Sequence, residues 1–287
     1  ADLIGASPKE IIFTGGGSEG DNMLIKGVAH ANVKKGRHII TTQVEHHAVL
    51  HTCEELAKEG FEITYLPVDE FGRVTAAQVE AALRDDTILV SVMYANNEIG
   101  TIMPIREIGA VCRAHKVLLH TDAVQAAGHI PIDVTSDNID LLTLTAHKFH
   151  GPKGVGFLYI NEKVRVQPQI LGGGQQNGMR SGTDNVPGIA GLGVAADMVY
   201  TDFDKKIQQL YALKERMAEG LSKLGDITVN GMPLMEGAPH IMSVTFHGVR
   251  SEVLLHTLEE FGVYISAGSA CSSHKRKPSA TLSAMGM

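Results

Sequence analysis

A lysine in a turn-forming segment is the first residue that could carry chemistry. Lys148 lies within TAHKFHGPKG, residues 145–154, directly after a strand expected at Leu141–Thr145. This position places the amine at the carboxyl end of a strand. A lysine amine that is partly withdrawn from water becomes nucleophilic enough to form a Schiff base with a carbonyl compound. An ordinary surface lysine is the alternative.

An aspartate occupies a matching place on a second strand. Asp122 follows a strand expected at Val117–His120. A carboxylate there suits the ring nitrogen of pyridoxal 5'-phosphate (PLP), because the ion pair keeps the ring protonated and electron-withdrawing. If the two strands are adjacent, Asp122 and Lys148 meet at one edge of the sheet. Capping of the helix that follows is the other interpretation of Asp122.

A glycine-rich turn, GGGSEGDN at residues 15–22, joins a strand expected at Glu10–Phe13 to a helix expected at Ser18–His30. Free backbone N–H groups and the helix dipole make such a junction a site for anions, and Ser18 adds a hydroxyl. The spacing matches neither GxGxxG nor GxxxxGK[ST], so we expect a single phosphate rather than a dinucleotide or a nucleoside triphosphate. A turn without a ligand is the alternative.

Two histidines follow the strand expected at His38–Thr42. In EHHAVL, residues 45–50, an imidazole could stack on an aromatic cofactor or transfer a proton near neutral pH. His47 and His51 are four positions apart, but no nearby carboxylate or cysteine completes a set of the HExxH type, so no metal site is predicted. A hydrogen-bonded structural pair of histidines stays open.

A cysteine lies in a segment of small residues. Cys271 belongs to SAGSACSSHKRK, residues 266–277, where nearby cations would raise the thiolate fraction. A buried, inert thiol is the alternative. With Cys53 and Cys112 the set is odd and holds no CxxC pair, which excludes a disulfide framework and a four-cysteine zinc site. We therefore expect a reducing, cytoplasmic location.

Short apolar strands alternate with helical segments along most of the chain, which predicts an α/β fold with a mostly parallel sheet and right-handed crossovers. Ligands of such sheets gather at the carboxyl ends of the strands. Besides the elements above, we expect strands at Glu62–Leu66, Thr87–Tyr94 and Val155–Ile160, and helices at Val49–Lys58 and Ile105–His115.

The pattern changes after about Gly193. An amphipathic helix is expected at Asp204–Leu224, followed by strands at Ile241–Phe246 and Gly262–Ile265 around a helix at Ser251–Glu260. The predicted domains are therefore a large one at residues 1–193 and a small α+β one at residues 194–287.

Composition restricts the class of protein. The chain has 287 residues with 44% hydrophobic and 20% charged positions, enough for a large and a smaller domain. Its net charge of −7 argues against sequence-independent binding of nucleic acid. No apolar run reaches the about 18 residues of a membrane span, and no signal peptide is visible. Residues 1–6 resemble the tail of a helix and residues 280–287 stop without a cap, so we expect an excerpt of a longer protein.

Taken together, these stretches resemble the cysteine desulfurases of the NifS/IscS type, in the class V aminotransferase branch of PLP enzymes. The resemblance spans the whole chain through GGGSEGDN, EHHAVL, VSVMYANNEIGT, HTDAVQAAG, TAHKFHGPKGVG, GGGQQNGMRSGTDNVPG and SAGSACSS. It implies the PLP-dependent transferase fold, aspartate aminotransferase-like (fold type I), with a mostly parallel large-domain sheet and a smaller C-terminal α+β domain.

The resemblance also implies residue roles. Lys148 would hold PLP as a Schiff base, Asp122 would pair with the ring nitrogen, and Cys271 would accept sulfur. The other roles are Gln125 near the phenolic oxygen, His46 stacked on the ring, Asn97 by the substrate carboxylate, Gly17, Ser18, Thr145 and His147 as phosphate ligands, and Thr183 reaching the phosphate of a neighbouring subunit.

The implied reaction converts L-cysteine to L-alanine and passes sulfur, as a persulfide on Cys271, to an acceptor protein such as an iron–sulfur scaffold or a thiolation protein. The shared site implies a homodimer. This chain departs from the family in lacking a DNAATTP-like amino-terminal stretch and the arginine beyond the catalytic cysteine that binds the substrate carboxylate. Ser18 stands where many relatives have Thr.

Three alternatives stay open. The first is another class V PLP reaction, such as a selenocysteine lyase, an aminotransferase or a β-lyase, because Lys148 and Asp122 serve every branch. The second is an inactive homologue that only docks partners. A nucleotide-binding Rossmann protein is the least supported, since the glycine spacing is wrong.

Overall fold

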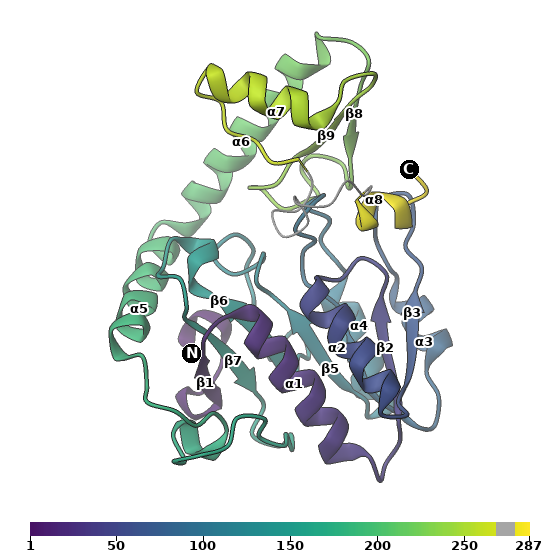
Figure 1. The fold of residues 1–287 in the computed structure, drawn as a ribbon, viewed down its shortest axis with the longest axis vertical. Helices are drawn as coiled ribbons and strands as arrows, with labels where there is room; N and C mark the ends of the chain where they lie inside the picture. The colour runs from purple at the N-terminus through teal and green to yellow at the C-terminus, as the bar shows by residue number, and fades with distance from the viewer. Residues whose placement is uncertain (268–278) are drawn as a thin grey trace.

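A seven-stranded sheet forms the centre of the chain in the computed structural model, which describes residues 1–267 and 279–287. The strand order is β1-β7-β6-β5-β4-β2-β3 (Figure 1). The strands are β1 Ile11–Thr14, β2 His38–Thr42, β3 Glu62–Leu66, β4 Thr87–Ser91, β5 Leu118–Asp122, β6 Leu141–Thr145 and β7 Gly156–Ile160.

The helices alternate with these strands in the first half of the chain and dominate the second. They are α1 Gly17–Asn32, α2 His47–Lys58, α3 Ala76–Ala82, α4 Ile105–His115, α5 Val186–Tyr200, α6 Phe203–Ser222, α7 Ser251–Glu260 and α8 Ala280–Ala284. Short 3-10 turns lie at Asp2–Ile4, Pro8–Glu10, Ala146–Phe149 and Gln176–Gly178. Within the described ranges, no helix is both long and apolar enough to cross a membrane.

The sheet is parallel from β3 to β6. Only β7 breaks this pattern, since it runs antiparallel to both β6 and β1. Strands β2, β4 and β6 are buried at every position, as strands covered on both faces must be. One apolar cluster joins the sheet to α1 and α2, and a second joins it to α4 and α5. The helices packed on the two faces of the sheet therefore hold the carboxyl ends of β4, β5 and β6 in place.

A smaller assembly lies beyond the sheet, at the top of Figure 1. Strand β8, Ile227–Asn230, pairs antiparallel with β9, Ser243–Phe246. Helix α6 leads into it, and two of its side chains hold the turn before β9. The Nζ of Lys214 donates to the carbonyl of Ala238 at 2.9 Å, and the hydroxyl of Tyr211 donates to that of Gly237 at 3.0 Å.

Several expectations about this second half need correction. No strand forms at Gly262–Ile265; the Val263 amide instead donates to Leu258 at 3.0 Å in the turn that ends α7. The partner of β9 is β8, which the sequence did not predict. Helices α5 and α8 were also missed, as was α3 in the first half of the chain.

The predicted limit at Gly193 lies inside α5. Leu192 and Ala195, on either side of it, both belong to the core of the large sheet, so we place the change of architecture after Tyr200. The division into two domains stays a prediction.

The two ends also differ from expectation. Residues 2–4 form a single 3-10 turn that ends at Gly5, with φ of 69°, rather than the tail of an α-helix. At the other end, α8 is followed by Gly286 with φ of 82°, and the Met287 amide donates to the carbonyl of Leu282 at 3.0 Å. This left-handed turn caps the end of the helix, which was expected to stop without a cap.

Candidate active site

A cavity of about 900 Å³ opens between the carboxyl ends of the parallel strands and the β8–β9 assembly. Its walls include most of the residues singled out in the sequence: Gly17, Ser18, His46, Asn97, Asp122, Gln125, Thr145, His147 and Lys148. Segments far apart in sequence are brought together here because adjacent parallel strands end at one edge of the sheet.

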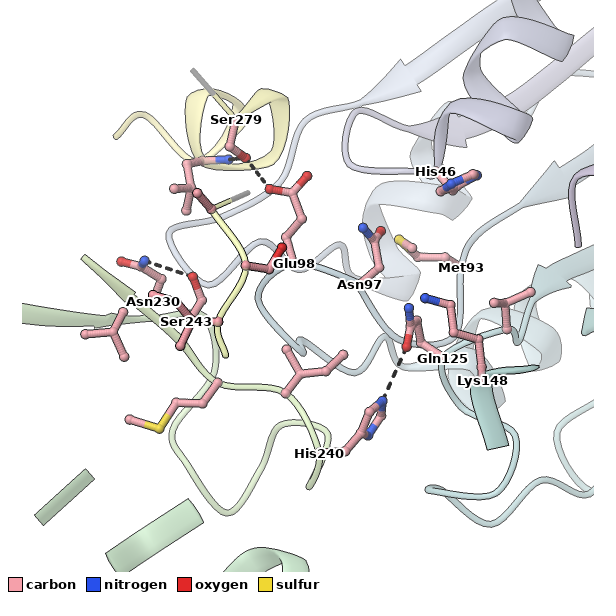
Figure 2. A pocket seen from close by; sticks show the side chains of 18 of the residues that line it. His46, Met93, Asn97, Glu98, Gln125, Lys148, Asn230, His240, Ser243 and Ser279 are labelled. Atoms are coloured by element: carbon pink, nitrogen blue, oxygen red, sulfur yellow. Dashed lines mark hydrogen bonds between the residues drawn. The ribbon is translucent and has the colours of Figure 1, made fainter. Parts of the chain in front are cut away.

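Lys148 and Asp122 lie on neighbouring strands, as the sequence predicted. Lys148 occupies the 3-10 turn that directly follows β6, and its exposed side chain extends into the cavity (Figure 2). Asp122 is the last residue of β5 and only 5% exposed. Its Oδ1 accepts from the amide of Val124 at 2.9 Å, the local contact that the capping interpretation required. Of the two groups, the carboxyl of Asp122 is therefore buried and the side chain of Lys148 is exposed.

Burial raises the pKa of Asp122 to about 6, against the opposing effects of the Val124 amide and of Lys148. A cationic group placed beside this carboxyl would lower that pKa again, because it would stabilise the charged form. A protonated ring nitrogen is such a group, so the residue fits the ring-nitrogen end of PLP.

A second carboxyl lies behind the first. Asp21 of α1 is 1% exposed, and its Oδ1 has no hydrogen-bond partner among the described residues. Burial, followed by the charge of Asp122, raises its pKa well above the usual value. Its neighbour His120 is fully buried between the hydroxyls of Ser91, at 2.8 Å, and Thr143, at 3.1 Å.

The glycine-rich turn meets the cavity at the start of α1. Gly16 has φ of 142°, a value that L side chains rarely adopt, and a Cβ on Gly17 would lie 2.8 Å from Cγ2 of Val124. No side chain within the described residues caps this helix start. The hydroxyl of Thr145 and Nδ1 of His147 are hydrogen-bonded at 3.0 Å alongside it. Such a cradle fits a phosphate.

His46 caps the next helix. Its Nδ1 accepts from the amide of Ala48 at 3.1 Å, which fixes the ring at the wall of the cavity. Burial lowers the pKa of His46, and His47, Lys148 and His51 lower it further. The imidazole is therefore neutral near pH 7, which suits stacking on an aromatic ring.

The two asparagines of NNEIG have different places. Asn96 is fully buried, and its Oδ1 accepts from the amides of Glu98 and Ile99, so it serves the turn itself. Asn97 is half-buried and lines the cavity. Glu98 lines it too and accepts a hydrogen bond from Ser279.

Several cavity residues were not singled out in the sequence, among them Met93, Glu98, Val124 and His240. Glu98 and Val124 are sequence neighbours of candidates, which was the available signal. His240 comes from the turn before β9, and its Nε2 lies 3.3 Å from Oε1 of Gln125. No local sequence pattern predicted that contact.

Two candidates lie elsewhere. Thr183 is exposed and does not line the cavity; nearby Arg180 is hydrogen-bonded to Glu19 of α1 at 2.9 Å. Cys271 lies outside the described residues. The other thiols, Cys53 and Cys112, are buried, and burial raises the pKa of each to about 12, so neither is a nucleophile at neutral pH.

Comparison with known proteins assigns the family. The Aminotransferase class-V family matches residues 1–286. The chain is 50% identical to "Cysteine desulfurase IscS" of Methanosarcina thermophila, over 100% of this chain and 71% of the relative. It is 51% identical to "Putative cysteine desulfurase IscS 1" of Bacillus subtilis (strain 168), over 98% of this chain and 74% of the relative. The chain belongs to the class-V aminotransferase family, among its cysteine desulfurases.

Similar solved structures agree with this assignment. A "NIFS-LIKE PROTEIN" superimposes with a TM-score of 0.92 and 39% identity, over 100% of this chain and 75% of that one. The structure "SspA in complex with cysteine" superimposes with a TM-score of 0.86 and 38% identity, over 100% of this chain and 80% of that one. These similarities confirm the predicted resemblance and the predicted fold class.

Proposed function

We propose that this chain is a PLP-dependent cysteine desulfurase, which converts L-cysteine to L-alanine and leaves the sulfur as a persulfide on Cys271. The observation that carries the proposal is that Lys148 and the buried carboxyl of Asp122 share one cavity with the glycine-rich start of α1. The relatives bear the name cysteine desulfurase, and one structural neighbour was solved with cysteine bound.

The chain offers a partner to each part of PLP. Lys148 would hold the aldehyde carbon and Asp122 the ring nitrogen, while His46 would lie against the ring and Gln125 by the phenolic oxygen. The phosphate ligands would be Gly17, Ser18, Thr145, His147 and, from a second copy of the chain, Thr183. When bound, PLP takes up the electron pair released as a bond to the substrate Cα breaks.

The residues of the chain would supply the rest of the reaction. Asn97 would orient the substrate carboxylate. The amine of Lys148 would remove the Cα proton. The Cys271 thiolate would then attack the substrate sulfur. The Sγ–Cβ bond breaks, its electron pair stays with the carbon chain, and protonation of that chain yields alanine.

Further proposals concern the setting. A sulfur-acceptor protein, either an iron–sulfur scaffold or a thiolation protein, would receive the persulfide sulfur. A homodimer would bring Thr183 to the cavity of its partner. The net charge of −7 supports a protein acceptor rather than direct binding of nucleic acid. A reducing cytoplasm would keep Cys271 active.

The test is a visible spectrum of the purified protein with PLP, before and after L-cysteine and a thiol reductant, with sulfide and alanine assayed in the same sample. We expect an absorption band that changes with cysteine, and equal amounts of the two products. A band that responds to another amino acid but not to cysteine would overturn the substrate. A protein that takes up no PLP would overturn the function.

Two variants with matched controls assign the roles. Lys148→Ala should lose the band, whereas Lys153→Ala, in the same segment, should keep it. Cys271→Ser should keep the band and lose sulfide, whereas Cys112→Ser should keep both, because Cys112 is buried away from the cavity. A band retained in Lys148→Ala, or full sulfide production by Cys271→Ser, would contradict the assignment.

A further inference from the structure

Two histidines stack at the wall of the cavity. The ring centroids of His129 and His240 lie 3.6 Å apart, with 19° between the planes. His129 comes from the turn after β5 and His240 from the turn before β9, so the stack joins the large sheet to the β8–β9 assembly. Both side chains are half-buried.

His240 also contacts a residue assigned to the cofactor. Its Nε2 lies 3.3 Å from Oε1 of Gln125. With the Gln125 carbonyl oriented towards His240, that oxygen accepts, and the tautomer of His240 that fits carries its proton on Nε2. The NH₂ group of Gln125 is thereby turned the opposite way, and Figure 2 shows it on the side of Lys148.

We propose that His240 is a positioning residue: it fixes the amide of Gln125 so that the NH₂ group, and not the carbonyl, faces the phenolic oxygen of PLP. The inference rests on the proposed function and adds to it a residue from a distant turn. In the reversed orientation the Gln125 carbonyl would face the phenolic oxygen, and two acceptors would repel each other. An amide held only by its own rotamer could adopt either orientation.

The surroundings of His240 keep its ring neutral. Lys148, Lys214 and His129 all face it with positive or potentially positive groups. Burial, followed by these neighbours, lowers the pKa of His240 to about 3. A protonated ring would also place an N–H on Nδ1, which is buried without a hydrogen-bond partner among the described residues.

His129 holds the ring from the other side. Its own pKa is lowered by burial and by His150, against a hydrogen bond to the Ala127 backbone. Two neutral imidazoles can stack face to face, whereas two cations at 3.6 Å would repel. The stack therefore fixes the plane from which His240 donates.

A donor to the phenolic oxygen has a spectroscopic consequence. It stabilises negative charge on that oxygen and so opposes protonation of the neighbouring Schiff-base nitrogen. Loss of the donor should move the pH midpoint of the visible spectrum upward. We expect a shift of about one pH unit, the size of one charge-assisted hydrogen bond.

The experiment is a pH titration of the visible spectrum in a double-mutant cycle. His240→Leu and Gln125→Leu should each raise the midpoint by a similar amount, and the double variant should add nothing to either. His240→Asn, whose amide can still donate, should restore most of the wild-type midpoint. His256→Leu, exposed on α7, is the matched control and should leave it unchanged.

A shift in His240→Leu that adds to that of Gln125→Leu would overturn the inference, since His240 would then act independently. An unshifted midpoint in a folded, PLP-bound His240→Leu would do the same. Nitrogen NMR of the cofactor-free protein gives a separate measurement: we expect the proton of His240 on Nε2, and a proton on Nδ1 refutes the inference whether or not PLP binds. Failure to bind PLP with the expected tautomer present would instead count against the proposed function.

Discussion

The Oδ1 atom of Asp21 lies 3.6 Å from Nε2 of His120, and the two side chains are 1% and 0% exposed. The contact is not an ion pair, because burial lowers the pKa of His120 to about 3 and leaves the ring neutral at physiological pH. The neutral ring instead links the hydroxyls of Ser91 and Thr143 directly behind Asp122. A polar but uncharged layer therefore supports the proposed ring-nitrogen site.

This neutral histidine should make the protein sensitive to acid. In the unfolded chain the pKa of His120 is about 6.5. Between that pH and about 3, the unfolded state therefore binds a proton at His120 that the folded state does not bind. The free energy of unfolding should fall as the pH drops from about 6.5 towards about 3. The variant His120→Gln should show a smaller fall, and at pH 7 it should be less stable by about 1–3 kcal/mol because a buried hydroxyl loses its partner.

Urea unfolding at pH 7 and pH 5 measures this difference. His256→Gln, at an exposed position, serves as the control and should change neither value. Equal pH slopes for His120→Gln and the wild type would show that the ring is protonated within the folded protein.

Glu45 should act in the opposite direction. Burial raises its pKa to about 8, although the Met93 amide and the Thr42 hydroxyl hydrogen-bond to its carboxyl. The folded state then keeps a proton that the unfolded state releases above about pH 4.5, so Glu45 reduces stability as the pH rises towards 8. Relative to the wild type, Glu45→Gln should gain up to about 1.4 kcal/mol per pH unit in that window.

Urea unfolding of both proteins at pH 6 and pH 7.5 tests the sign. Glu59→Gln, on the surface at the end of α2, is the control. A stability difference that does not change between the two pH values would mean that Glu45 is ionised in the folded protein.

The parallel core was predictable because most of its strands are buried on both faces and are rich in Leu, Ile, Val and Thr. Strands β2 and β6 begin and end at the residues expected, as do helices α4 and α7. The β8–β9 pair could not be predicted from the sequence. The segment Ile227–Asn230 is short and half-exposed, and it becomes a strand only through its partner. Helix α5 is apolar around most of its circumference, so no period of 3.6 marks it.

The part of the site that could be predicted follows from one rule, that ligands of a parallel sheet bind at the carboxyl ends of its strands. The same rule explains which residues could not be predicted. Residues at the ends of parallel strands, such as Asp122 and Lys148, could be placed together from the sequence alone. His240 could not, because it enters from a turn whose position depends on how α6 anchors Ala238. The buried polar residues behind the site could not be predicted either, because Asp21 looks in the sequence like an ordinary polar residue of an amphipathic helix.

Two helical glycines should respond in opposite ways to one added methyl group. A Cβ on Gly109 of α4 would lie 2.1 Å from the carbonyl oxygen of Asp137, whereas a Cβ on Gly193 of α5 would meet nothing within 4 Å. Gly109→Ala should therefore destabilise the protein by about 2–3 kcal/mol. Gly193→Ala should stabilise it by about 0.5–1 kcal/mol, because alanine loses less backbone entropy in a helix. Urea unfolding compares the two, and a destabilised Gly193→Ala would indicate that a second chain packs against that face of α5.

Thr183 provides the most direct test of a shared active site. It is exposed and lies outside the cavity of its own chain, so Thr183→Ala should weaken PLP binding only through the partner subunit. In a mixed dimer of Thr183→Ala with Lys148→Ala, one site combines the intact Lys148 with the intact Thr183 of the other subunit, while the second site has neither. Such a dimer, isolated with two affinity tags, should bind PLP at one site with wild-type affinity. Each homodimeric variant should bind it weakly or lose the visible band, and a mixed dimer that binds PLP no better than Thr183→Ala alone would contradict the sharing of Thr183 between subunits.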